Sequence, residues 1–124
     1  MIKPEDLLDF VETPDFTESW AKLYLDDNDL AALQITVMRG GKNAPVIRGT
    51  GGLRKLRFSP PQWNVGKSGA LRVCFVYYAE FGVILLVLVY AKSRQETISE
   101  AEKKGLRALV EEYRVELEII KKER

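Results

Sequence analysis

The 124-residue sequence contains no histidine. Histidine is the commonest acid–base catalyst at physiological pH and the commonest protein ligand of transition metals. Its absence therefore excludes Ser–His and Cys–His catalysis. Any chemistry that this chain performs must rest on lysine, arginine, tyrosine, serine or carboxylate side chains.

Cysteine and long apolar runs are scarce as well. Cys74 is the single cysteine, which excludes an internal disulfide and fits a reducing cytoplasm. It lies in the apolar segment RVCFVYY, so we expect a small core residue. The longest apolar run, at 81–91, is too short to span a membrane, and the N-terminus MIKPEDLLDF has carboxylates where a signal peptide has basic residues. We expect one cytoplasmic domain over residues 1–124, without a cofactor and without a membrane partner.

Carboxylates are missing from one long part of the chain. Residues 1–29 hold nine acidic and two basic residues, residues 30–79 hold eight basic and no acidic residues, and residues 80–124 hold nine of each. This segregation predicts a positively charged surface that binds an anion, and nucleic acid is the partner that it favours. The alternatives are a basic surface that docks an acidic protein and a chance clustering of the basic residues.

The spacing of apolar residues and the capping signals predict the order of helices and strands. In chain order these are a strand at 7–13, a helix after the N-cap Thr13, a helix at 30–39, strands at 53–58, 70–78 and 81–92, and a helix after the N-cap Ser99. The order β-α-α-β-β-β-α indicates an α+β fold with a mostly antiparallel sheet, a helical hairpin and a C-terminal helix. The core-facing stripe of the last helix is expected at Leu106, Leu109, Val110, Tyr113, Leu117 and Ile120.

Basic residues gather on two of the predicted strands. Residues of a strand alternate between two faces, so Lys55 and Arg57 share one face of the strand at 53–58. Arg72 lies on the next strand and can join them on an exposed, concave face of the sheet. The cations expected at the rim of this face are Lys67 and Lys92.

Two aromatic residues and a glycine cluster have alternative interpretations. The segment SPPQWNVGKSG, at 59–69, contains adjacent prolines and two glycines, which predict an exposed loop. Within it, Trp63 either stacks on a nucleic-acid base or tucks under the loop. Tyr78 ends a predicted strand, where it either contacts RNA or packs in the core. We interpret the glycines of 49–52 as backbone turns that lead into the strand.

Four segments of the chain resemble the RelE/HigB group of bacterial toxins. They are VIRGTGGLRKLRF, GKSGALRVCFVYY, LLVLVYAKS and ISEAEKKGLRALVEEY, and the match runs over residues 45–117. The resemblance implies the toxin component of a type II toxin–antitoxin system. Such a toxin is a ribosome-dependent endoribonuclease that cuts mRNA, halts translation and is neutralised by a cognate antitoxin protein.

The resemblance also implies a chemistry and a set of residues. Cleavage proceeds without a metal, because the ribose 2′-hydroxyl attacks the adjacent phosphate and clustered cations stabilise the charge that develops there. The residues that match the catalytic positions of the family are Lys55, Arg57, Arg72 and Lys92. The further RNA-binding candidates are Arg54, Lys67, Trp63, Tyr78 and Arg94.

The chain departs from the family pattern at Ser68, Ala70 and Ser93, where relatives carry a cation, a glycine and an arginine. Three alternatives to an active nuclease follow. The chain is an attenuated toxin kept for antitoxin binding, a non-catalytic RNA- or ribosome-binding module, or a ParE-like toxin that inhibits DNA gyrase.

Overall fold

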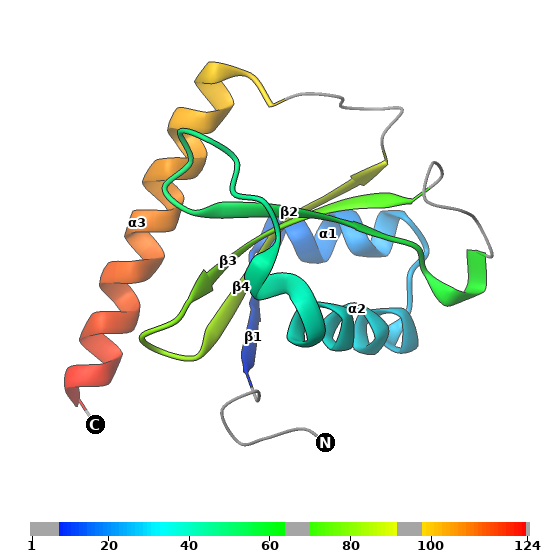
Figure 1. The fold of residues 1–124 in the computed structure, drawn as a ribbon, viewed down its shortest axis with the longest axis horizontal. Coiled ribbons are helices and arrows are strands. Elements are labelled where there is room, and N and C mark those ends of the chain that lie inside the picture. The colour runs from blue at the N-terminus through cyan, green and yellow to red at the C-terminus, as the bar shows by residue number, and fades with distance from the viewer. Residues whose placement is uncertain (1–7, 64–69, 92–97, 124) are drawn as a thin grey trace.

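The computed structural model describes residues 8–63, 70–91 and 98–123 (Figure 1). A four-stranded sheet of order β1-β4-β3-β2 organises the fold. β1 pairs with β4 in parallel, while β2 pairs with β3 and β3 with β4 in antiparallel fashion. The expected α+β class and the mostly antiparallel sheet are therefore confirmed. The strands are β1 (Asp9–Glu12), β2 (Leu53–Phe58), β3 (Leu71–Tyr78) and β4 (Val83–Ala91).

Helices cover both faces of the sheet (Figure 1). α1 (Pro14–Lys22) and α2 (Asp27–Gly40) lie on one face, and α3 (Glu100–Glu123) lies on the other. Two short 3₁₀ turns, η2 (Gly41–Asn43) and η3 (Pro61–Trp63), flank β2 in the chain. Among the described residues, no helix is long and apolar enough to cross a membrane.

Side-chain caps determine where the first two helices begin. Thr13 caps α1, because its hydroxyl oxygen accepts from the backbone N–H of Phe16 and its O–H donates to the carbonyl of Val87 on β4. α2 begins at Asp27, three residues before the predicted start. The reason is a capping box, in which Asp26 and Asp29 each accept a hydrogen bond from the other's backbone N–H.

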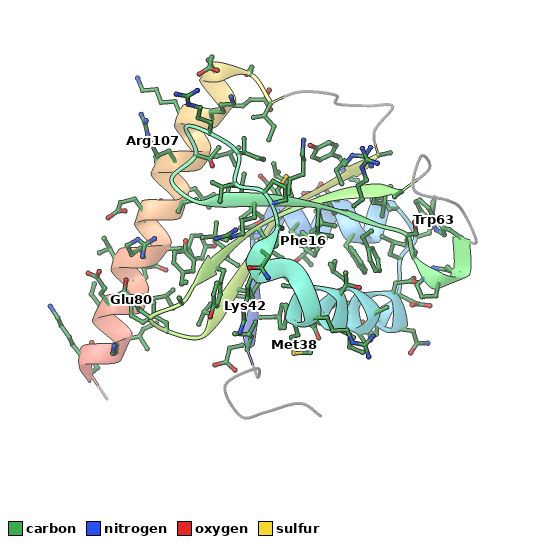
Figure 2. The ribbon with its side chains drawn as sticks, in the orientation of Figure 1. Phe16, Met38, Lys42, Trp63, Glu80 and Arg107 are labelled. Atoms are coloured by element: carbon green, nitrogen blue, oxygen red, sulfur yellow. The ribbon has the colours of Figure 1, made fainter. Side chains whose placement is uncertain are left out.

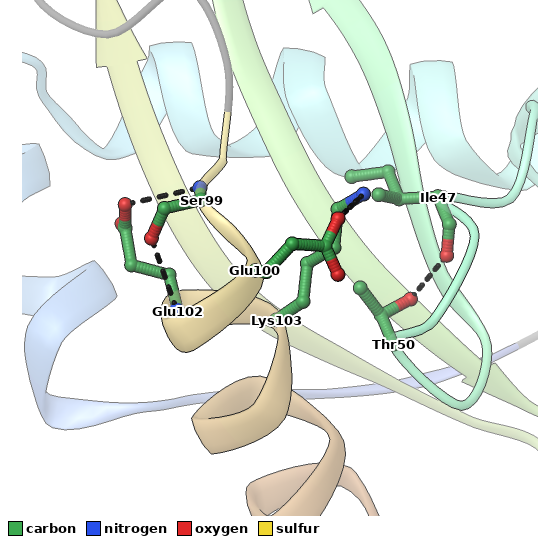
Figure 3. A network of polar contacts seen from close by, with 6 residues as sticks. All are labelled: Ile47, Thr50, Ser99, Glu100, Glu102 and Lys103. Atoms are coloured by element: carbon green, nitrogen blue, oxygen red, sulfur yellow. Dashed lines mark hydrogen bonds and ion pairs between the residues drawn. The ribbon is translucent and has the colours of Figure 1, made fainter.

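The start of α3 agrees with its sequence signal. Ser99 Oγ accepts from the backbone N–H of Glu102 at 3.1 Å, and Glu102 Oε1 accepts from the N–H of Ser99 at 3.2 Å (Figure 3). The predicted stripe packs against the sheet as far as Leu117, with Val110 buried. Ile120, which was expected in the stripe, is 49 % exposed, so the expectation is wrong at this position.

The two faces of the sheet form two separate apolar clusters. On the α1 and α2 face, Phe16 packs with Phe75 and other alternate residues of β3 and β4 (Figure 2). On the α3 face, Val110 packs with Cys74, Val76 and Tyr78. Alternation along β3 therefore separates Leu71, Val73, Phe75 and Tyr77 from Arg72, Cys74, Val76 and Tyr78, as the two-residue period predicts.

A hydrogen bond joins the end of β3 to the middle of α3. The Tyr78 hydroxyl donates to the carbonyl of Val110 at 2.8 Å, and both residues are buried. The guanidinium of Arg114 lies over the Tyr78 ring, 5.1 Å from its centroid. These contacts hold α3 to the sheet beside the β3–β4 turn.

Removal of the Tyr78 hydroxyl is expected to loosen this attachment. Tyr78→Phe keeps the ring and loses the bond to Val110, which lowers the free energy of unfolding by about 1 kcal/mol. Urea denaturation measures the change. Tyr24→Phe is the matched control, because Tyr24 is 90 % exposed and its substitution should leave stability unchanged. Equal stability of Tyr78→Phe and the wild type would contradict the assignment.

Candidate functional site

Two arginines lie directly opposite each other on neighbouring strands. Arg57 of β2 pairs in register with Arg72 of β3, and Lys55 pairs with Cys74. Side chains opposite each other in an antiparallel pair lie on the same face of the sheet. Since Cys74 belongs to the α3-side cluster, Lys55, Arg57 and Arg72 all point to that side. The expected gathering of these three cations on one face is therefore observed.

Their degrees of burial differ. Lys55 and Arg57 are exposed, whereas Arg72 is only 7 % exposed and its Nη1 donates to the carbonyl of Ala70 at 3.0 Å. The expectation that all three cations are exposed is wrong for Arg72. It is buried because it lies on β3, which has β2 on one side and β4 on the other.

These cations line an open groove of about 600 Å³. Lys55 and Arg57 form part of its wall, and the buried Arg72 also lines it. The remaining lining residues are Ala44, Pro45, Leu56, Ser59 and Ala70.

The charge in the groove is not balanced by an ion pair within the described residues. Within the described part of the chain, no carboxylate lies within ion-pair distance of Lys55, Arg57 or Arg72. Like charges directly opposite on two strands destabilise a sheet, and a buried cation without a counter-ion adds a further cost. A bound anion would remove both costs, so the groove has the electrostatics of an anion-binding site.

Ala44 and Pro45 form one wall of the groove because segment 44–47 is bonded to the outer edge of β2. The N–H of Lys55 donates to the carbonyl of Pro45 at 3.1 Å, and the N–H of Ile47 donates to that of Leu53 at 2.7 Å. Arg54 Nη1 also donates to the carbonyl of Ala44 at 2.6 Å. Arg54 therefore anchors this wall from the opposite face of β2, and its guanidinium is not among the groove-lining groups.

Tyr90 of β4 lies beside Arg72, its partner in register. Burial raises the pKa of the Tyr90 hydroxyl to about 12, and the neighbouring Cys74 contributes to the rise while Arg72 opposes it. The hydroxyl is therefore protonated at neutral pH, so it can donate a hydrogen bond and cannot act as a base.

Two of the RNA-binding candidates lie outside the groove. Tyr78 is 1 % exposed and its hydroxyl is bonded to Val110, so the predicted contact with RNA is wrong and the alternative of core packing holds. Trp63 is half-buried against the α1 and α2 cluster, on the other face of the sheet (Figure 2). Of the two interpretations of Trp63, the structure agrees with the one in which its side chain tucks under the loop.

Three further candidates lie outside the described residues. These are Lys67, Lys92 and Arg94, together with the family departures Ser68 and Ser93. In the described ranges, no group of three or more cysteine, aspartate or glutamate side chains is arranged to hold a metal ion.

Sequence reasoning did not foresee the wall made by Ala44 and Pro45. Ala44 precedes a proline, and the residue before a proline prefers an extended backbone. The sequence therefore indicates an extended backbone at this position. Nothing in the sequence indicates that this segment binds the edge of β2, because that contact joins residues about ten positions apart through a turn.

No protein-family model matches the chain. A functional proposal therefore rests on the groove and on the four segments that resemble the toxins.

Alkaline pH is expected to destabilise the fold through Cys74. Burial raises the pKa of this thiol from 9.0 to about 11, against smaller opposite effects of Tyr90 and Lys55. Because the unfolded chain loses the thiol proton first, the stabilisation is complete below pH 9 and is lost as the pH rises through 11. Between pH 9 and 10 the loss should be about 1 kcal/mol.

The control for this experiment is Cys74→Ala, which removes the thiol. Urea denaturation at each pH should give a shallower decline for this variant than for the wild type. The buried Tyr78 and the half-buried Tyr90, with pKa values raised from 10.0 to about 12, contribute to the decline of both proteins, so the difference between the two declines isolates the thiol. Parallel declines of the two proteins between pH 9 and 10 would refute the effect.

Proposed function

We propose that the chain is the toxin component of a type II toxin–antitoxin system and cleaves mRNA on the ribosome. The observation that supports this proposal most directly is Arg72. It is 7 % exposed, lies opposite Arg57 and opens on a groove without a described counter-ion. A phosphate of RNA supplies the missing charge, and the planar guanidinium fits two phosphate oxygens.

The groove has the groups that a metal-independent cleavage of RNA requires. The ribose 2′-hydroxyl attacks the adjacent phosphorus, and the P–O bond to the 5′-oxygen breaks. The products are a 2′,3′-cyclic phosphate and a free 5′-hydroxyl. Negative charge accumulates on the phosphorane oxygens in the transition state, where fixed cations stabilise it most.

The groove cations, the neighbouring Tyr90 and Lys92 each have a role in this proposed reaction. Arg72 and Arg57 bind the non-bridging phosphate oxygens from adjacent strands. Lys55, two residues before Arg57 on the same face, transfers the proton between the reacting oxygens. Tyr90 donates a hydrogen bond to the phosphate or to the leaving oxygen. Lys92, which the resemblance assigns to the same site, completes the set.

The proposed partners follow from the charge of the groove. The ribosome presents mRNA, whose phosphates occupy the cationic surface. The cognate antitoxin inhibits the toxin by covering the same groove with acidic side chains. This mode of inhibition explains how one surface without carboxylates serves both partners.

Loss of either arginine is expected to reduce the activity strongly. Expression of the wild type in bacteria should arrest growth and yield mRNA fragments with 5′-hydroxyl ends. Arg57→Gln and Arg72→Gln should reduce cleavage by about 10²-fold, because each removes one donor to the developing charge. Sequencing of RNA 5′ ends, with and without prior phosphorylation, measures both the amount and the chemistry of cleavage.

Arg39→Gln is the matched control, since Arg39 is an exposed cation in the last turn of α2 and does not line the groove. It should cleave like the wild type. The proposal fails if wild-type expression leaves growth and transcripts unchanged. Fragments with 5′-phosphate ends would contradict attack by the 2′-hydroxyl, and DNA breaks with intact mRNA would indicate a gyrase inhibitor.

A further inference from the structure

A second group of cations lies beside the groove, on the turn before β2 and on the first half of α3. Arg48, Lys104 and Arg107 are exposed, and none of them has a carboxylate within ion-pair distance in the described ranges. Lys103, by contrast, pairs with Glu100 at 3.3 Å (Figure 3). Among the residues that the structure describes, these three cations thus have no carboxylate partner.

The glycine turn brings these cations together because it packs closely on α3. Gly49 and Gly51 have φ values of 84° and 74°, which side-chain-bearing residues rarely adopt. A Cβ on Gly51 would lie 3.4 Å from Cγ of Arg107. The turn therefore rests on the aliphatic stem of Arg107, whose charged end extends to the surface (Figure 2).

The turn is held in place by hydrogen bonds of Thr50, which is fully buried. Its hydroxyl donates to the carbonyl of Ile47 at 2.6 Å (Figure 3). The same hydroxyl accepts from the N–H of Leu53 at 3.1 Å. Arg48 belongs to this fixed turn, and Lys104 lies one turn before Arg107 on the same face of α3. The three cations are therefore carried by a rigid part of the fold.

The second cation group is continuous with the groove. Pro45 lines the groove and is bonded to Lys55 of β2, and Arg48 follows it after three residues. An extended segment of that length spans about 10 Å. The chain thus leads from the groove wall at Pro45 to Arg48 and, through the glycine turn, to Arg107 of α3.

We propose that Arg48, Lys104 and Arg107 form a second RNA-binding surface, which holds the phosphates of a single strand that also occupies the groove. This inference rests on the proposed function, because RNA is the occupant of the groove. Proteins that bind single strands without reading their sequence follow the backbone with such rows of cations. The strand that leaves the groove along the edge of β2 meets this surface next.

Binding of short and long RNA tests the surface. The probes are single-stranded, fully 2′-O-methylated RNAs, which cannot be cleaved, of about four and about twelve nucleotides. In the triple variant R48Q/K104Q/R107Q, the Kd of the long RNA should rise about 10-fold, while the Kd of the short RNA stays unchanged. The slope of log K against log salt for the long RNA should decrease by about 2, since each phosphate contact contributes about 0.7.

The control is R39Q/K121Q/K122Q, which removes the same charge from exposed positions on α2 and on the last turn of α3. It should bind both RNAs like the wild type. Equal affinities of the R48Q/K104Q/R107Q protein and the wild type for the long RNA would overturn the RNA surface and leave an acidic protein as its partner. The proposed RNA surface would also be overturned if the R48Q/K104Q/R107Q protein lost the same affinity for both RNA lengths, or if the control variant lost as much affinity for the long RNA.

Cleavage separates this inference from the proposed function. Suppose that the R48Q/K104Q/R107Q protein loses affinity for the long RNA alone, while the wild type cuts no mRNA. This result supports the surface and contradicts the nuclease. Suppose instead that the wild type cuts mRNA, while the R48Q/K104Q/R107Q protein binds both RNAs as tightly as the wild type. This result supports the nuclease and contradicts the surface.

Discussion

The groove is built around the electrostatic repulsion between two arginines on neighbouring strands. Arg57 and Arg72 lie directly opposite each other, and Arg72 is almost fully buried without a described carboxylate partner. If stability were the only requirement, apolar or oppositely charged residues would be expected at these positions. The conflict is understandable if the protein binds an anion there, because the ligand then provides the charge that the chain omits.

The rest of the fold supports this pair on a rigid frame. β3 is held between β2 and β4, and its other face is covered by the cluster around Phe16. On the α3 face, the bond from Tyr78 to Val110 fixes the helix at one end of the sheet. The other end of this face is left to the cations and to segment 44–47. The apolar contacts that stabilise the domain thus also determine where the groove is open.

Local patterns in the sequence predicted much of this arrangement. The two-residue period of LRKLRF placed Lys55 and Arg57 on one face, and Thr13 and Ser99 marked two helix starts correctly. The features that these local patterns did not predict depend on tertiary contacts. Arg72 is buried because of the strands on either side, and Trp63 lies on the other face because η3 folds back on that cluster. For Tyr78 the sequence left two alternatives, and a helix that comes later in the chain decides for core packing. None of these contacts leaves a local signal in the sequence.

The central claim is that Arg72 destabilises the free protein and is stabilised by a bound phosphodiester. Urea unfolding of the wild type and of Arg72→Met, with and without a non-cleavable 2′-deoxy dinucleotide, tests it most directly. We expect the variant to be at least as stable as the wild type without the dinucleotide, because the uncompensated charge is gone. Only the wild type should gain stability when the dinucleotide is added. A less stable variant whose response to the dinucleotide equals that of the wild type would contradict the account.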